Sequence, residues 1–146
     1  MKDSFVLQQR DGLWWGAFPS FAEAGFLTAC SCRLHGDSTL VPGTLNLALH
    51  VGDDPDKVRA GRVRFARALG VDPARFTTCA QVHGDRVAVV TEAAVGSGAF
   101  ALSDTVAPDG RHWRGTVAGT DALVTCLSDV PLLLFYADCT PVLLAD

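Results

Sequence analysis

The sequence predicts an α/β fold, and three observations carry that prediction. Short apolar segments bounded by Gly, Pro, Asn and Asp recur along the chain, as is typical of strands. One segment, from Asp54 to Gly70, has the start and stop signals of a helix. The chain has 146 residues, 49% of them hydrophobic, which is enough for a core and too short for two ordinary domains. We therefore expect residues 1–146 to form a single domain.

The first elements expected are strands. Residues 5–9 and 13–18 flank Asp11-Gly12, a pair that favours the two-residue turn of a hairpin. Residues 26–33 are also rich in apolar side chains and indicate a further strand. A loop punctuated by Gly and Pro is expected after it, over residues 36–43.

The helix comes next. Asp54 suits the N-cap, Pro55 suits the first helical position, and Gly70 suits the C-terminal stop. An apolar stripe with helical spacing runs along it, marked by Val58, Phe65 and Leu69.

Arg62 lies on that apolar stripe, so its guanidinium needs a partner. In one interpretation the side chain reaches the edge of the stripe or pairs with a structural carboxylate. In the other, its fixed fork of donors binds a phosphate or carboxylate ligand.

The second half of the chain is predicted to be mainly β. Residues 76–83 and 86–91 are separated by Gly84-Asp85, which indicates a second hairpin. Residues 93–119 are rich in Gly, Ala, Ser and Pro and are expected to be irregular. Short buried strands are expected over residues 123–127, 131–137 and 142–145.

Composition argues against two kinds of partner. A net charge of −4 does not favour a nucleic-acid surface, which needs clustered Lys and Arg. The N-terminus has no apolar signal segment, and the longest apolar run, residues 130–137, is too short to cross a bilayer. Five scattered cysteines form no disulfide framework. We expect a cytoplasmic protein that binds neither nucleic acid nor membrane.

Two pairs of polar residues fall near expected strand ends. His83 ends a strand, and the alternation of side chains puts Gln81 on the same face. Cys139 follows another strand, and Asp138 beside it is costly there unless it is hydrogen-bonded or coordinated.

His83 and Cys139 together suit two chemistries. As a dyad, the imidazole would deprotonate the thiol for nucleophilic catalysis. As ligands, imidazole and thiolate suit zinc, and a catalytic zinc also needs a third protein ligand. The spacing alone does not choose among His35, His50 and His112 for that role.

Four blocks of sequence resemble the YfiH family. They are NLALHVGDDPDKV (residues 46–58), QVHGDRV (81–87), TDALVT (120–125) and ADCTPVLLAD (137–146), in this order. The family is also called the laccase-domain or multicopper polyphenol oxidase family. It includes purine nucleoside phosphorylases that also deaminate adenosine, and a peptidoglycan editing factor.

The resemblance implies a mixed β-sheet sandwiched by helices and a zinc site. In the family, zinc is held by the His of the QVHG block, the Cys of the ADC block and a second His in a block similar to HAGWRG. The first two correspond to His83 and Cys139. We expect the third ligand downstream of Asp146, so residues 1–146 would be the N-terminal portion of a longer member whose fold is incomplete at its C-terminus. Copper is the alternative metal.

Two positions depart from the family pattern. The helix has Gly61 where the family usually has Asn before the Arg. The turn at residues 32–36 keeps Arg33 but has His35 in place of a Gly. Both changes bear on the geometry of the ligand site.

The implied substrates are purine nucleosides and phosphate. The reactions are phosphorolysis of adenosine, inosine and methylthioadenosine, with adenosine deamination at the same site. Arg33 or Arg62 would supply the phosphate site. The expected catalytic residues are His83, Cys139 and Arg62, and the expected substrate-binding residues are Asn46, His50, Arg33, Gln81 and Asp138.

Three alternatives stay open. Copper-dependent oxidation of phenols is weaker, because four dispersed His cannot hold several copper ions. A Cys139–His83 hydrolase acting on peptidoglycan precursors is the second. An inactive fragment, with an exposed sheet edge after Ala145, is the third.

Overall fold

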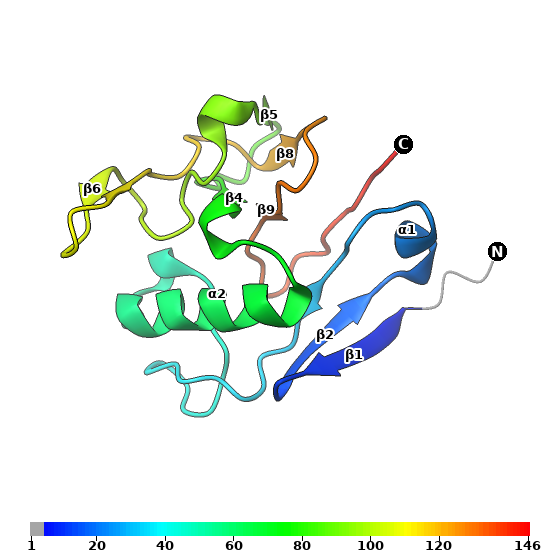
Figure 1. The fold of residues 1–146 in the computed structure, drawn as a ribbon, viewed down its shortest axis with the longest axis horizontal. Helices are drawn as coiled ribbons and strands as arrows, with labels where there is room; N and C mark the ends of the chain where they lie inside the picture. Colours follow the sequence, from blue (N-terminus) through cyan, green and yellow to red (C-terminus); the bar gives the residue numbers. More distant parts are fainter. Residues whose placement is uncertain (1–4) are drawn as a thin grey trace. The chain divides into compact units, whose positions relative to one another are not determined.

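The computed structural model describes residues 5–146 and divides the chain into two compact units. Unit 1 comprises residues 5–47, 52–69 and 136–146, and unit 2 comprises residues 48–51 and 70–135. Each unit is assembled from separate stretches of the chain (Figure 1). The α/β class is confirmed, because helices accompany both parallel and antiparallel strand pairs. The single domain stays a prediction.

Unit 1 begins with the hairpin that the sequence predicts. Strands β1 (Val6–Arg10) and β2 (Leu13–Ala17) pair antiparallel. Asp11 and Gly12 join them with φ angles of 52° and 78°. Both values lie in the left-handed region that a type I′ turn requires, so the turn pair sets the register of the hairpin.

The strand expected over residues 26–33 is mostly wrong. Only β3 (Cys30–Ser31) forms there, paired antiparallel with β2. A short helix that the sequence reasoning missed, α1 (Pro19–Glu23), precedes it. Phe26 and Leu27 stay 42% and 58% exposed, so their apolar character reflects neither strand pairing nor burial.

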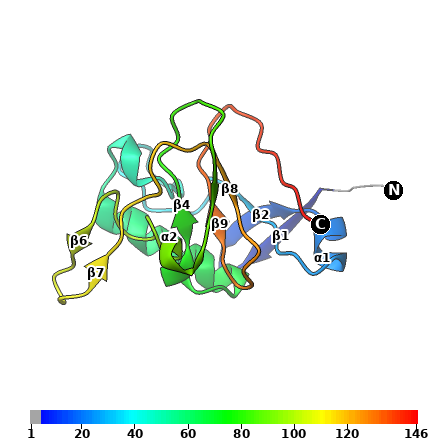
Figure 2. The ribbon, with the colours of Figure 1, turned by 90° about the horizontal axis from the view of Figure 1, so that it is seen from above.

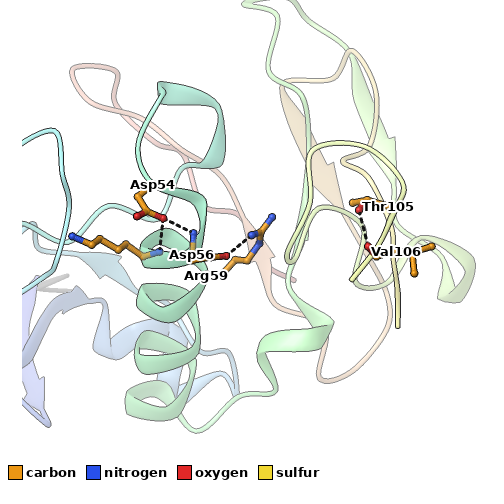
Figure 3. A network of polar contacts seen from close by, with 6 residues as sticks. Asp54, Asp56, Arg59, Thr105 and Val106 are labelled. Atoms are coloured by element: carbon orange, nitrogen blue, oxygen red, sulfur yellow. Dashed lines mark hydrogen bonds and ion pairs between the residues drawn. The ribbon is translucent and has the colours of Figure 1, made fainter. Parts of the chain in front are cut away.

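Helix α2 (Pro55–Leu69) confirms the main helix prediction. Oδ1 of Asp54 accepts hydrogen bonds from the backbone N–H groups of Asp56 (2.9 Å) and Lys57 (3.4 Å), as an N-cap does (Figure 3). Gly70, with φ of 76°, follows the last turn.

The inner face of α2 packs on the hairpin. The ring of Phe65 lies 6.3 Å from that of Trp15 on β2, with the planes at 84°. On the outer face Asp56 and Arg59 form an ion pair of 2.7 Å (Figure 3). The buried residues of α2 are Val58, Gly61, Arg62, Phe65, Ala66 and Ala68.

Unit 2 contains two parallel strand pairs. β4 (Thr77–Thr78) pairs with β9 (Leu132–Leu133) (Figure 2). β5 (Val87–Val89) pairs with β8 (Ala122–Val124) (Figure 1). The hairpin expected around residues 84–85 is therefore wrong, since β4 and β5 pair with distant segments and not with each other.

Residues 93–119, expected to be irregular, contain a small hairpin of β6 (Thr105–Val106) and β7 (His112–Trp113). Oγ1 of Thr105 donates to the carbonyl of Val106 at 3.4 Å (Figure 3). Three 3₁₀ helices complete unit 2: η1 (Leu49–Val51), η2 (Pro73–Arg75) and η3 (Glu92–Ala94).

β4 lies in the core of unit 2. Thr77 and Thr78 are fully buried, and Oγ1 of Thr77 accepts a hydrogen bond from the N–H of Gly96 at 3.1 Å. Gly98, with φ of 78°, lies so close that a Cβ built on it would come within 1.9 Å of Oγ1 of Thr78. A side chain at Gly98 therefore cannot fit unless the Thr78 and Thr116 side chains are displaced.

The strand expected over residues 142–145 is not formed. These residues have no strand pairing, and Val142 and Leu144 are 77% and 90% exposed. Across residues 5–146, no helix combines the length and apolar character needed to cross a membrane.

Candidate functional site

One carboxylate organises the loop that carries His83. Oδ1 of Asp121 accepts hydrogen bonds from the N–H groups of Val82 (2.9 Å) and His83 (2.8 Å). Oδ2 accepts from the N–H of Gly84 at 2.8 Å. These bonds, with that of Gly84 the largest cause, hold the pKa of Asp121 below its ordinary value.

His83 lies in this loop and not at the end of a strand as the sequence predicts, because residues 80–84 form no strand. Its φ is 61°, in the left-handed region that non-glycine residues rarely adopt and that His tolerates better than most. The side chain is exposed. The alternation argument for Gln81 and His83 therefore does not apply.

Gln81 and His50 nevertheless meet at a third residue of unit 2, Phe135. Oε1 of Gln81 accepts a hydrogen bond from the N–H of Phe135 at 2.9 Å. The ring of Phe135 lies 5.7 Å from the imidazole of His50, with the planes at 61°. Phe135 therefore contacts both predicted site residues, Gln81 through its backbone and His50 through its ring.

In unit 1, the segment over residues 45–47 is held at both ends by predicted site residues, Arg33 from the substrate-binding set and Arg62 from the catalytic set. The carbonyl of Arg33 accepts from the N–H of Leu45 at 2.6 Å. Nε of Arg62 donates to the carbonyl of Leu47 at 2.7 Å. The structure thus brings Arg33 and Arg62 to the same short segment.

Arg62 is 1% exposed, which confirms that it faces inward on α2. Burial, and secondarily the charge of Arg59, lowers the pKa of Arg62 to about 10. The guanidinium therefore stays cationic at neutral pH. Its catalytic role stays a prediction.

Asn46 belongs to a buried polar network around Asp53. The carboxylate of Asp53 accepts five hydrogen bonds: from Ser38 Oγ (2.7 Å), Thr39 Oγ1 (2.6 Å), Thr39 N (2.8 Å), Asn46 Nδ2 (3.0 Å) and Asp54 N (2.8 Å). The bonds from the Thr39, Asn46 and Ser38 side chains, in that order, hold the pKa of Asp53 far below its usual range. One donor of Asn46 therefore serves the fold.

Arg33 has an exposed side chain. Its guanidinium has no hydrogen bond or ion pair with the other residues that the structure describes. Nearby, Arg64 pairs with Asp37 at 3.1 Å and donates to the carbonyl of His35 at 3.1 Å. His35 has a φ of 61°, in the left-handed region that glycine adopts more readily than other residues.

Cys139 and Asp138 lie in an exposed bend of unit 1 over residues 137–139. The thiol of Cys139 is 3.9 Å from Oδ1 of Asp138. Since Asp138 is exposed, its charge is hydrated and does not carry the cost expected at a buried strand end. Just before the bend, Tyr136 Oη hydrogen-bonds with Sγ of Cys30 on β3.

Residues 5–146 do not by themselves fit a complete zinc site. No group of three or more His, Cys, Asp or Glu side chains within them is arranged so that it could hold a metal ion. A catalytic zinc takes three protein ligands. His83 belongs to unit 2 and Cys139 to unit 1.

The sequence reasoning missed two carboxylates, Asp121 and Asp53. Asp121 directly precedes β8, within the TDALVT block, and Asp53 precedes the N-cap of α2. An acid at a strand start or beside a cap is a weak local signal. The hydrogen-bond partners of Asp121 lie 37 to 39 residues away in sequence, and those of Asp53 lie up to 15 residues away. A local sequence pattern therefore does not reveal either carboxylate.

The pattern of the family described as "Multi-copper polyphenol oxidoreductase laccase" matches residues 27–146. The chain is 42% identical over 116 residues to purine nucleoside phosphorylase ORF3 of Streptomyces griseus. It is 34% identical over 142 residues to purine nucleoside phosphorylase YlmD of Geobacillus stearothermophilus. These matches cover 78% and 97% of the chain.

Solved structures agree with these sequence relatives. The crystal structure of YlmD superposes with a TM-score of 0.75 at 31% identity, over 93% of the chain. That of a hypothetical protein YfiH of Bacillus licheniformis superposes with a TM-score of 0.73 at 25% identity, over 91% of the chain. The chain spans 39% to 47% of the length of these relatives. All eight predicted site residues fall within the matched segment.

Proposed function

Because the chain belongs to the multi-copper polyphenol oxidoreductase laccase family, which includes YfiH and YlmD, we propose that it forms part of a purine nucleoside phosphorylase. The observation that carries the proposal is the 42% identity to a relative with that name over 78% of the chain. The expected substrates are adenosine, inosine and methylthioadenosine, with phosphate as the nucleophile. Adenosine deamination at the same site and a cytoplasmic location belong to the same proposal.

Phosphorolysis joins a phosphate oxygen to C1′ of the ribose while the bond from C1′ to the purine nitrogen breaks. The purine leaves with the electron pair of that bond and takes up a proton. The protein must therefore bind an anion near the ribose and stabilise the departing base.

Arg33 is the better candidate for binding phosphate. Its exposed guanidinium makes no ion pair with the other described residues, so all its donors are available to an anion. Arg62 is buried and uses Nε on the carbonyl of Leu47, which favours a role in supporting residues 45–47 beside the bound substrate.

His50, Gln81 and Phe135 support a place for the purine base. The Phe135 ring offers an apolar face, and the His50 imidazole offers donors or acceptors at its edge. Oε1 of Gln81 is engaged with the N–H of Phe135, which leaves the Gln81 amide nitrogen to hydrogen-bond a base.

His83 and Cys139 would supply two ligands of a zinc ion, with a third from residues outside this pair. Zinc bound there would supply positive charge to a developing anion and acidify a bound water. Asp138 would orient the bend that carries Cys139.

The test is a phosphate-dependent assay of base release from adenosine and inosine, on the purified natural protein. His83→Asn is the informative variant, because Asn also tolerates the left-handed backbone at this position whereas Ala would add strain. We expect His83→Asn and Cys139→Ser each to lower kcat/KM by about 100-fold or more. His112→Asn, an exposed His on β7, should leave it unchanged.

Other outcomes assign other chemistry. Absence of phosphate-dependent base release in the wild-type protein contradicts the proposal. The description of the family as laccase favours one second candidate, a copper-dependent oxidase, which predicts oxygen consumption with a phenol after copper loading. Hydrolysis of peptidoglycan precursors that is blocked by thiol reagents would indicate the Cys139–His83 dyad. If all of these activities were absent, the chain would be inactive.

A further inference from the structure

The Val82–Gly84 loop has a feature that family resemblance does not explain. Three successive backbone N–H groups, those of Val82, His83 and Gly84, point to one carboxylate, Asp121, at 2.8 to 2.9 Å. Successive N–H groups around a left-handed residue form a concave anion-binding turn. Here the protein fills that turn with its own side chain.

Asp121 is itself firmly placed. Its N–H and that of Ala122 both donate to the carbonyl of Arg86, at 3.0 and 3.3 Å. Ala122 begins β8, which pairs in parallel with β5. The carboxylate thus connects the His83 loop to the start of a strand pair.

The contact also accounts for the conformation of His83. A left-handed φ of 61° costs a non-glycine residue about 1 kcal/mol or more unless other bonds favour it. The three charge-assisted hydrogen bonds to Asp121 form with His83 in this conformation. All three of these loop N–H groups donate to the same carboxylate.

We propose that Asp121 is the positioning residue of the site: its carboxylate fixes the Val82–Gly84 turn and thereby sets where the His83 imidazole is presented. This inference rests on the proposed function in that it assigns His83 to the reaction. Asp121 acts on His83 through the loop backbone.

The loop is exposed, so loss of the carboxylate leaves three hydrated N–H groups and not three buried ones. The fold of unit 2 should therefore survive in Asp121 variants. Asp121→Ala removes all three acceptor contacts. Asp121→Asn keeps Oδ1 for Val82 and His83 but turns an amide N–H₂ toward the N–H of Gly84, so its effect should be smaller.

The experiment compares wild type, Asp121→Ala, Asp121→Asn and a matched control, Asp109→Ala. Asp109 is also a carboxylate of unit 2 that holds its own loop, through the N–H (3.2 Å) and Nε (2.7 Å) of Arg111. NMR measures amide hydrogen exchange at residues 82–84 and the ordering of the His83 ring. Steady-state kinetics measure kcat and KM for phosphorolysis.

We expect Asp121→Ala to speed exchange at residues 82–84 by about ten-fold or more and to disorder the His83 ring. It should lower kcat by about ten- to a hundred-fold, with a much smaller change in KM. The exchange rates and kcat of Asp121→Asn should lie between those of Asp121→Ala and wild type. Formate, which can enter the vacated turn, should restore part of kcat in Asp121→Ala, and Asp109→Ala should match wild type.

Unchanged exchange and ring order in Asp121→Ala would overturn the proposal, as would disorder of the ring with wild-type kcat. A loss of kcat in Asp109→Ala equal to that in Asp121→Ala would also overturn the proposal. If wild type shows no phosphorolysis, the proposed function fails, and the NMR comparison alone then decides whether Asp121 positions His83.

Discussion

The carboxylate of Asp53 shows how unit 1 holds a charge away from water. The residue is 7% exposed, and its two oxygens accept five hydrogen bonds. A buried charge is tolerated when its lone pairs are satisfied in this way. The network joins the loop of Ser38 and Thr39 to Asn46 and to the start of α2.

Asp53→Asn should lower the free energy of unfolding by about 1.5–3 kcal/mol at pH 7, because its amide N–H₂ would face donors. Urea unfolding measures this. The control is Asp56→Asn, whose side chain is 88% exposed and pairs with Arg59; it should change stability by less than about 0.5 kcal/mol. Equal effects of the two variants would contradict the role given to Asp53.

The pH dependence of that difference has a definite sign. The pKa of Asp53 is lower in the folded protein than in the unfolded chain, where the pKa of Asp is about 3.9. Its stabilisation is therefore present above about pH 4 and is lost as pH falls toward the folded pKa. The gap between wild type and Asp53→Asn should shrink between about pH 5 and about pH 2.

At this scale the sequence predicts some positions and not others. Arg62 was predicted to face inward because an α-helical stripe is a local pattern, and it is buried. Asp121 was not identified because its partners at residues 82–84 lie far away in the chain. The substrate-binding and catalytic roles stay predictions at every position.

At the scale of elements, local turn chemistry decides some connections and misleads at others. Asp11-Gly12 and Gly84-Asp85 are similar turn signals, but only the first joins paired strands. In the second case β4 pairs with β9 and β5 pairs with β8, and long stretches of chain separate the two strands of each pair. Parallel partners are set by contacts distant in sequence, which a turn signal does not encode.

Gly12 and Gly98 allow the stability cost of a strained backbone to be compared with the cost of a crowded side chain. Gly12 and Gly98 both have φ of 78°, but a Cβ at Gly12 would meet no atom within 4 Å. At Gly98 it would come within 1.9 Å of Thr78 Oγ1 and 2.7 Å of Thr116 Cγ2. We expect Gly12→Ala to cost about 1 kcal/mol and Gly98→Ala to cost at least about 3 kcal/mol, or to prevent folding.

Thermal and urea unfolding of the two variants, side by side, measure the difference. Since both substitutions place Ala at the same φ, the excess cost of Gly98→Ala is due to crowding around β4. Equal losses of stability in the two variants would show that Thr78 and Thr116 move aside without cost.

At the scale of the whole molecule, neither unit is a continuous piece of chain. Unit 1 is interrupted by residues 48–51 and 70–135, which form unit 2. Unfolding of unit 2 alone would leave the end of α2 and Tyr136 joined by a long free loop, whose closure costs entropy. We therefore expect the two units to unfold together.

The three tryptophans test this in one sample, because Trp14 and Trp15 belong to unit 1 and Trp113 to unit 2. Their indole N–H signals, followed by NMR in urea, should disappear at the same midpoint. Gly12→Ala in unit 1 should shift the Trp113 midpoint as much as those of Trp14 and Trp15. Separate midpoints would contradict the single domain predicted from chain length.

The overall fold class was accessible from sequence because it needs only the local signals of strands, turns and one capped helix. The pairing of strands was not, since four short parallel strands carry little pattern of their own. Residues 142–145 show the same limit: the sequence predicts a strand for this apolar segment, yet it pairs with none in the described structure.

Tyr136 is the single tyrosine of the chain, and its hydroxyl hydrogen-bonds with the thiol of Cys30. Partial burial and this bond raise the pKa of Tyr136, so the phenol stays neutral at pH values where a free tyrosine ionises. Ultraviolet absorbance of phenolate therefore comes from one known place, next to the bend that carries Cys139. The protein contains its own optical reporter for the attachment of that bend to β3, without any dye or label.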